Sequence, residues 1–306
     1  MEESGMLTRD EFFRRFSSGI HLLDGATGTE LWKAGMPGDA CAEQWILEHP
    51  RPLLDLQEAY AAAGSEIIYA PTFRAQPLAL RKWNLSGKTG EINRELVALS
   101  RKAAPGCLVA GDMTTMHGCM DSGREDYRRQ MEEAYRLQME ALLNGGADLL
   151  VAETLMDSAE ALAILDLARQ LDAPAVMVSF ACRNTGTLFS GEPVPAAVAA
   201  VEKAGAAAVG VNCIAASDGL PALVAEIRRH TALPVLCKPN AGIPANGKYP
   251  VGKARFASIV QNCAESGAVL IGGCCGTTPE YIRLIREYLD SRYPDIPADI
   301  DTCRHL

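Results

Sequence analysis

The 306-residue sequence has no apolar run approaching the roughly 20 residues that a membrane-spanning helix needs. It has no basic run and no patch in which arginine or lysine is interleaved with aromatic residues. Its 29 basic and 38 acidic residues give a net charge of -9. These absences argue against a membrane protein and against nucleic acid as a partner. We therefore expect the protein to act on a small molecule or to bind another protein.

The N-terminus lacks the apolar core of a signal peptide, because charged residues recur from Glu2 to Arg15. We therefore expect a cytoplasmic protein. Its ten cysteines could suggest a disulfide framework, but a chain of this length with 48% hydrophobic residues can bury a core without disulfides. We expect most of the cysteines to be buried small residues or plain loop thiols, namely Cys41, Cys107, Cys119, Cys182, Cys237, Cys263 and Cys303.

Eight short apolar runs recur along the chain, and a segment with helical periodicity follows each. The runs are rich in Val, Ile, Leu and Ala with little polar alternation, which is typical of strands buried on both faces of a parallel sheet. They span residues 20–23, 66–70, 107–110, 148–152, 175–180, 207–211, 235–238 and 268–271. The helical segments span residues 52–63, 91–103, 125–144, 158–170, 195–204, 219–230, 253–266 and 279–289.

Eight strands alternating with eight helices is the count of a single (β/α)8 TIM barrel. We predict such a barrel over residues 1–293 and a C-terminal tail over residues 294–306. A doubly wound open sheet is the alternative. In a barrel, the active site lies at the carboxyl ends of the strands, so the residues that follow each run are the candidates for chemistry.

Three cysteines stand at such strand ends. Cys213 follows the sixth run, and Cys274 and Cys275 follow the eighth, after a pair of glycines. Adjacent cysteines are poor disulfide partners, because the small ring strains the bond. Three thiols at one rim instead suggest a catalytic zinc site with an open fourth position, and burial as small apolar residues is the alternative. A zinc held by three thiolates favours a soft incoming ligand such as a substrate thiol.

Two acids also follow strands, Asp24 after the first run and Glu153 after the fourth. Such a pair can hold an ammonium group, and the glycine- and threonine-rich turn after Asp24 can offer backbone N–H groups to a carboxylate. Together these features indicate a pocket for an amino acid. A plain turn or helix cap at Asp24 and a solvated strand end at Glu153 are the alternatives.

These residues resemble the zinc-dependent homocysteine S-methyltransferase family. The family includes the first module of cobalamin-dependent methionine synthase, the betaine enzyme and the S-methylmethionine enzymes. The pairing of a Val-Asn-Cys segment with a Gly-Gly-Cys-Cys-Gly segment is the most specific part of the resemblance. The matching segments are residues 24–29, 153–154, 210–213, 239–242 and 272–279.

The resemblance implies that Cys213, Cys274 and Cys275 hold Zn²⁺ and that homocysteine thiolate takes the open position. The sulfur would then attack an activated methyl group and give methionine. The chain is accordingly expected to be an enzyme, a homocysteine S-methyltransferase.

By the same resemblance, Asp24 and Glu153 bind the amino group of homocysteine, and the backbone amides around Gly25 and Ala26 bind its carboxylate.

The methyl donor is less directly indicated. Aromatic side chains surround the trimethylammonium group in the betaine enzyme, whereas this chain aligns Ala40, Arg74 and Leu155 there, and an arginine would repel a cation. This disfavours betaine and, more weakly, S-methylmethionine. The segment 238–242 is closer to the methionine synthase module, and the chain carries no cobalamin or folate domain. We therefore expect a methylated corrinoid on a separate protein.

Other functions stay open. The donor could be S-methylmethionine or another small molecule, or the chain could be a non-catalytic zinc- or thiol-binding partner subunit. Arg74 and the 112–117 segment after the third run depart from the family pattern. The thiol could therefore differ from homocysteine, or the reaction could run toward demethylation.

Overall fold

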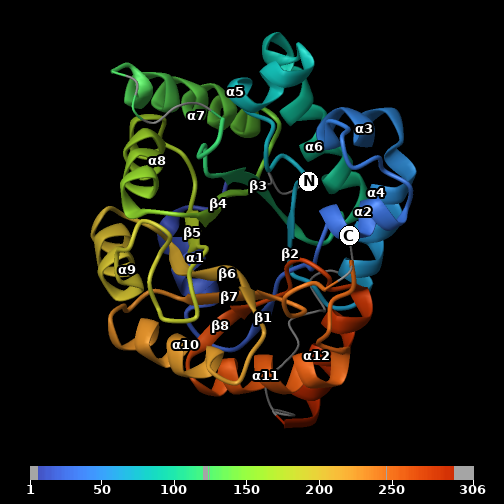
Figure 1. The fold of residues 1–306 in the computed structure, drawn as a ribbon, viewed down its shortest axis with the longest axis vertical. Helices are drawn as coiled ribbons and strands as arrows, with labels where there is room; N and C mark the ends of the chain where they lie inside the picture. The colour runs from blue at the N-terminus through green and yellow to red at the C-terminus, as the bar shows by residue number, and fades with distance from the viewer. Residues whose placement is uncertain (1–5, 120–122, 124, 246, 293–306) are drawn as a thin grey trace.

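The computed structural model describes residues 6–119, 123, 125–245 and 247–292. The predicted tail, with Cys303, lies outside the described residues. Eight parallel strands form one sheet in the order β1-β8-β7-β6-β5-β4-β3-β2, and a bridge between Leu23 and Ile67 brings its two edges together (Figure 1). The (β/α)8 barrel is confirmed, and the open-sheet alternative is wrong. The strands are β1 (His21–Leu22), β2 (Ile67–Tyr69), β3 (Leu108–Thr114), β4 (Leu149–Leu155), β5 (Val176–Phe180), β6 (Ala208–Ala215), β7 (Val235–Asn240) and β8 (Ala268–Ile271).

Helices surround the barrel, and each of the eight predicted helical segments has a counterpart. Gly64, Gly205 and Gly267 follow three of these helices with φ values of 102°, 103° and 108°, the left-handed conformation that commonly ends a helix. The counterparts are α4 (Pro50–Ala62), α6 (Thr89–Ala103), α7 (Tyr127–Asn144), α8 (Ser158–Gln170), α9 (Val194–Lys203), α10 (Leu220–Arg229), α11 (Lys253–Glu265) and α12 (Pro279–Arg292).

Several shorter helices were not predicted from the sequence. One of them, α1, had a detectable signal: Thr8 and Glu11 form a capping box, in which each side chain caps the backbone of the other. The helices without a predicted counterpart are α1 (Arg9–Phe16), α2 (Gly28–Lys33), α3 (Ala42–Glu48), α5 (Pro77–Leu80) and the 3₁₀ turns Arg81–Trp83 and Ser86–Lys88.

Strand alternation divides the core into two layers. One apolar cluster fills the barrel lumen and includes Tyr69, Val151 and Leu236, and the larger cluster lies between the strands and the surrounding helices. Phe12 and Phe16 of α1 belong to the lumen cluster and are fully buried, and Figure 1 shows α1 behind the centre of the barrel. The amino end of the lumen is therefore closed by apolar side chains.

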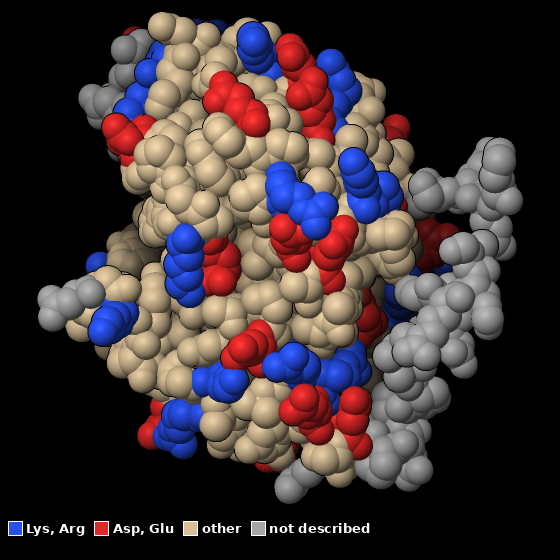
Figure 2. Space-filling view, turned by 90° about the vertical axis from the view of Figure 1, so that its right-hand side faces the viewer, with Lys and Arg blue, Asp and Glu red and all other residues tan. Residues whose placement is uncertain are grey.

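Acidic and basic side chains are interspersed over the face shown in Figure 2, and its described part has no continuous basic patch. Across the described ranges, no helix has both the length and the apolarity that crossing a bilayer requires.

Candidate active site

The three predicted thiols meet at the carboxyl end of the barrel. The Sγ atoms of Cys213, Cys274 and Cys275 all lie within 4.8 Å of one another, each side chain is half-buried, and none is in a disulfide. Hydrogen bonds from Cys274 and then Cys275 lower the pKa of Cys213 to about 3. The same contacts with Cys213 raise the pKa of Cys274 well above its ordinary value and that of Cys275 to about 11.

Backbone hydrogen bonds to neighbouring strands fix the Cys274–Cys275 segment. The N–H of Cys274 donates to the carbonyl of Pro239 at 2.8 Å, and the carbonyl of Cys275 accepts from the N–H of Ala241 at 2.9 Å. Glycine is required at position 272, because a Cβ there would lie 2.6 Å from the carbonyl oxygen of Asp24. The two thiols are thus held by contacts with β7 and with the segment after β1.

Cys213 reaches the other two thiols through an irregularity in β6. Its φ is 54°, in the left-handed region that non-glycine residues rarely adopt, and the register between β6 and β7 shifts between Asn212 and Ala215. The adjacent Asn212 is fully buried. Two consecutive residues therefore both serve the site, whereas a regular strand would point them to opposite faces.

Asn212 connects the thiol site to the acid on β4. Its Nδ2 donates to Glu153 Oε2 at 3.1 Å and to Thr154 Oγ1 at 2.7 Å. Its Oδ1 accepts from the N–H of Thr154 at 2.8 Å and from the Ser179 hydroxyl at 2.9 Å. These bonds hold Thr154 at a φ of 61°, a strained value for a β-branched residue. Asn212 therefore fixes the end of β4 as well as the direction of the Glu153 carboxylate.

Glu153 is nearly fully buried and points into the lumen, two residues beyond Val151 of the lumen cluster. Burial, more than the neighbouring charges of Asp24 and Cys213, raises the pKa of Glu153 to about 7, while Lys238 acts in the opposite direction. The carboxyl group consequently changes charge near neutral pH.

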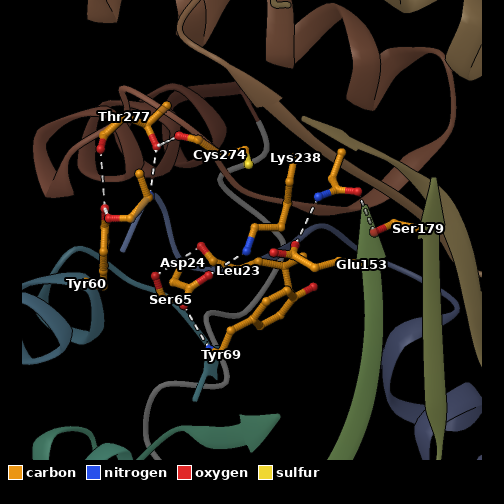
Figure 3. Close-up of polar contacts among 12 residues, drawn as sticks. Leu23, Asp24, Tyr60, Ser65, Tyr69, Glu153, Ser179, Lys238, Cys274 and Thr277 are labelled. Atoms are coloured by element: carbon orange, nitrogen blue, oxygen red, sulfur yellow. Dashed lines mark hydrogen bonds and ion pairs between the residues drawn. The ribbon is translucent and has the colours of Figure 1, made fainter. Parts of the chain in front are cut away.

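Asp24 forms a buried ion pair that the sequence reading did not anticipate. Lys238 Nζ donates to Asp24 Oδ1 at 2.6 Å, and the N–H of Tyr69 donates to Oδ2 at 2.8 Å. Asp24 is 1% exposed and Lys238 is 4% exposed. The Lys238 ammonium also lies 3.5 Å from the centroid of the Tyr69 ring, and Figure 3 shows the three side chains together. Both carboxylate oxygens of Asp24 are therefore already bonded within the protein.

The turn after Asp24 is packed against α4 and against Thr277, which precedes α12. A Cβ at Gly25 would lie 2.5 Å from the Tyr60 hydroxyl, which explains the glycine. The N–H of Ala26 donates to Thr277 Oγ1 at 3.1 Å, and its carbonyl accepts from the Tyr60 hydroxyl at 2.9 Å (Figure 3). Ala26 thus already uses its amide in the protein.

The residues aligned with the betaine-binding aromatics do not form one surface. Leu155 is fully buried in the cluster between strands and helices, so it faces away from the lumen. Arg74 is exposed, and its Nη2 lies 3.6 Å from Cys119 Sγ. Ala40 is half-buried beside the cluster that packs around α3. Of the three, Leu155 has no part in lining the lumen.

The other predicted cysteines are buried or half-buried thiols. Cys119 is half-buried, and the rest of those that the structure describes are buried, namely Cys41, Cys107, Cys182, Cys237 and Cys263.

A second group of possible metal ligands lies after β3 and β4. His117 Nε2 lies 2.8 Å from Asp157 Oδ2, and Glu160 completes the group. However, Glu160 Oε1 accepts hydrogen bonds from the Tyr135 hydroxyl and from the N–H of Met116, both at 2.6 Å. These bonds indicate a structural role for this group.

Cys213, Cys274 and Cys275, here called the thiol triad, offer three sulfur atoms, which suit a soft metal. The three sulfur atoms are close enough to bind the same ion, and their side chains are half-buried on a rigid backbone. A catalytic zinc has three protein ligands of this kind and an open fourth position. The site residues that the sequence reading did not assign are Tyr69, Asn212 and Lys238. Each of the three lies on a strand at a position whose side chain points into the lumen, as the alternation of side chains along a strand predicts. This alternation is the signal that could have identified them.

Comparison with known proteins agrees with this geometry. A family model for homocysteine S-methyltransferase matches residues 21–289. The methionine synthase of Mycobacterium leprae is 30% identical over 289 residues, which cover 86% of this chain but only 24% of that protein. The crystal structure of the Escherichia coli homocysteine methyltransferase MmuM in its metallated form is similar with a TM-score of 0.78 and 28% identity, covering 90% of this chain and 99% of that one.

The apo form of MmuM gives a TM-score of 0.71. The carboxyl transferase domain of Rhizobium etli pyruvate carboxylase, with a TM-score of 0.57 and 14% identity, shares the fold alone. Because the family model covers nearly the whole barrel and includes all three thiols, this chain belongs to the homocysteine S-methyltransferase family.

Proposed function

We propose that the protein is a zinc-dependent methyltransferase that methylates the sulfur of homocysteine and forms methionine. The observation that carries this proposal is the convergence of Cys213, Cys274 and Cys275 within 4.8 Å at the mouth of the barrel. These three residues would hold the ion. When bound, zinc supplies a Lewis acid that keeps an incoming thiol deprotonated at neutral pH. The metallated form of MmuM supports a metal in the family fold.

The protein's own residues bind and orient the amino acid. Glu153 lies in the lumen beside the thiol triad and is the acid that receives the substrate ammonium most directly, because Lys238 already neutralises Asp24. Asp24 contributes by fixing Lys238 and the segment after β1. We assign the substrate carboxylate to the turn at Gly25 and Ala26, with the Gly25 amide as the main donor, since the Ala26 amide bonds Thr277.

Holding the amino acid at both of its charged groups directs the sulfur toward the mouth, where a donor can approach. In the transfer, the bond from sulfur to the methyl carbon forms as the bond from that carbon to its donor breaks, with the electron pair staying on the donor. The thiol proton leaves to solvent. The residues thus contribute orientation and charge complementarity, and the leaving group comes with the donor.

We propose a methylated corrinoid on a separate protein as the donor. The 30% identity to a methionine synthase supports this choice, and the exposed Arg74 at the rim disfavours a cationic donor. A small methylated molecule such as S-methylmethionine is the second candidate, favoured by a match that covers 99% of the E. coli homocysteine methyltransferase.

A donor screen tests the proposal. Zinc-loaded protein and homocysteine are incubated in turn with methylcobalamin, a methylated corrinoid protein, S-methylmethionine, betaine and methyltetrahydrofolate, and methionine is measured. Methionine from the corrinoid donors is expected. Formation only from S-methylmethionine would select the second candidate. Homocysteine binding without transfer from any donor would instead identify a non-catalytic partner subunit.

A further inference from the structure

Asp112 of β3 is an acid in the barrel lumen with no role in the site described above. Ala110, two residues earlier, belongs to the lumen cluster, whereas a Cβ on the intervening Gly111 would meet Leu142 of α7. By alternation, Asp112 therefore faces the lumen. It is 5% exposed, and its Oδ1 atom is buried without a hydrogen-bond partner. A buried carboxylate oxygen left unbonded is costly, so its presence suggests that a ligand satisfies it.

Tyr69 gives a second, independent observation. Its ring underlies the Lys238 ammonium, yet its hydroxyl is buried without a hydrogen-bond partner. After burial, the charge of Glu153 contributes most to raising the pKa of Tyr69, followed by those of Asp24 and Asp112. In Figure 3 the ring extends from β2 beneath Lys238 toward Glu153. The unbonded hydroxyl thus lies among the same acids as the unbonded Asp112 oxygen.

The charges of the lumen do not balance. Of the lumen side chains that the structure describes, Asp24, Asp112 and Glu153 are acidic, and Lys238, the cation that lowers the pKa of Asp112, is bonded to Asp24. Burial and then the neighbouring Glu153 raise the pKa of Asp112 well above its ordinary value. Asp112 and Glu153 are therefore two buried acids that favour their neutral forms, and a further cation would stabilise their ionised forms.

An ammonium group matches these acceptors in number and in charge. It has three N–H donors and no acceptor, and the lumen offers Asp112 Oδ1, the Glu153 carboxylate and the Tyr69 hydroxyl oxygen. We propose that Asp112 and Tyr69, together with Glu153, bind the ammonium group of the thiol amino acid and make the site selective for thiols that carry one. This inference rests on the proposed function and extends it to two residues outside the matched motifs.

The test compares two thiols that differ only in the ammonium group, homocysteine and 4-mercaptobutanoate. Their affinities for the zinc-loaded protein are measured by calorimetry for the wild type and for Asp112→Asn, Tyr69→Phe and Asp166→Asn. Asp112→Asn is expected to weaken homocysteine binding about 10- to 100-fold, the value of a lost charged hydrogen bond, and to leave 4-mercaptobutanoate unchanged. Tyr69→Phe keeps the ring under Lys238 and is expected to reduce the same preference by a smaller factor.

Asp166→Asn is the matched control, because Asp166 lies on the outer helix α8, is 56% exposed and pairs with Arg169. It should change neither affinity. Asp112→Asn should also raise the melting temperature, since it removes a buried unpaired acid, whereas a purely structural role predicts a decrease.

If Asp112→Asn and Tyr69→Phe both keep the wild-type preference for homocysteine over 4-mercaptobutanoate, the inference is overturned and the proposed function stays intact. A wild type that binds neither thiol would overturn the proposed function, and the inference with it.

Discussion

The two ends of the barrel lumen differ in the polarity of the side chains that line them. At the amino end, α1 inserts Phe12 and Phe16, both fully buried, among aliphatic side chains of the strands. At the carboxyl end lie three thiols, the buried ion pair of Asp24 and Lys238, and the acid Glu153, whose pKa burial raises to about 7. Because apolar burial contributes stability and buried charges cost it, the amino end stabilises the fold and the carboxyl end is available for chemistry.

The largest effect is expected when one thiol at the carboxyl end of the lumen is replaced. Cys275→Ser should remove stoichiometric zinc and reduce methyl transfer by more than about 10³-fold, because a serine hydroxyl replaces a soft sulfur ligand. Zinc is measured by elemental analysis, and the fold by circular dichroism. Cys263→Ser, at a buried thiol on α11, is the control for cysteine loss and should retain zinc. Full zinc and full activity in Cys275→Ser would refute the site assignment.

Lys238→Met tests whether the carboxyl end also supports the fold. The substitution leaves Asp24 buried without its cation, and removing one partner of a buried pair costs about 3–5 kcal/mol. We expect the free energy of unfolding in urea to fall by that amount. The double variant Lys238→Met/Asp24→Asn should recover most of the loss. A single variant as stable as the wild type would show that Asp24 is not held as an ion.

Phe12→Ala at the amino end should lower the stability of the fold without affecting the thiol site. Truncation of a fully buried aromatic side chain costs about 3–5 kcal/mol through lost burial and the cavity left behind. Zinc stoichiometry and the affinity for homocysteine should not change below the unfolding transition. A loss of zinc in the folded variant would contradict the separation between the two ends.

The smallest predicted effect is a pH dependence of thiol selectivity. Since burial raises the pKa of Glu153 to about 7, its ionised form appears only as the pH rises through 7, and ammonium binding is lost as the pH falls through that value. The affinity ratio of homocysteine to 4-mercaptobutanoate should fall by up to about tenfold per pH unit below 7. Taking the ratio cancels the thiol proton common to both ligands. In Glu153→Gln the ratio should be flat, and an unchanged slope there would exclude Glu153 as the titrating group.

Much of the fold could be predicted because it depends on local patterns. The eight apolar runs and the helical segments that follow them identify the barrel, and the meeting of the three thiols could be predicted because each thiol follows an apolar run. The helix α1 was missed although its Thr8 and Glu11 capping box is visible in the sequence. The site was harder to predict, since it depends on long-range pairing: Asp24 and Lys238 are 214 residues apart, and their ion pair follows from barrel closure. The irregular backbone at Cys213 likewise depends on contacts with β7 that no local pattern encodes.

X-ray absorption at the zinc edge tests the central claim most directly. Zinc-loaded protein should show three sulfur neighbours, supplied by Cys213, Cys274 and Cys275, and a lighter fourth ligand. Addition of homocysteine should raise the sulfur count to four, with release of a proton to the buffer. A sulfur count that stays at three with saturating homocysteine, or a first shell without three sulfurs before it is added, would contradict the account.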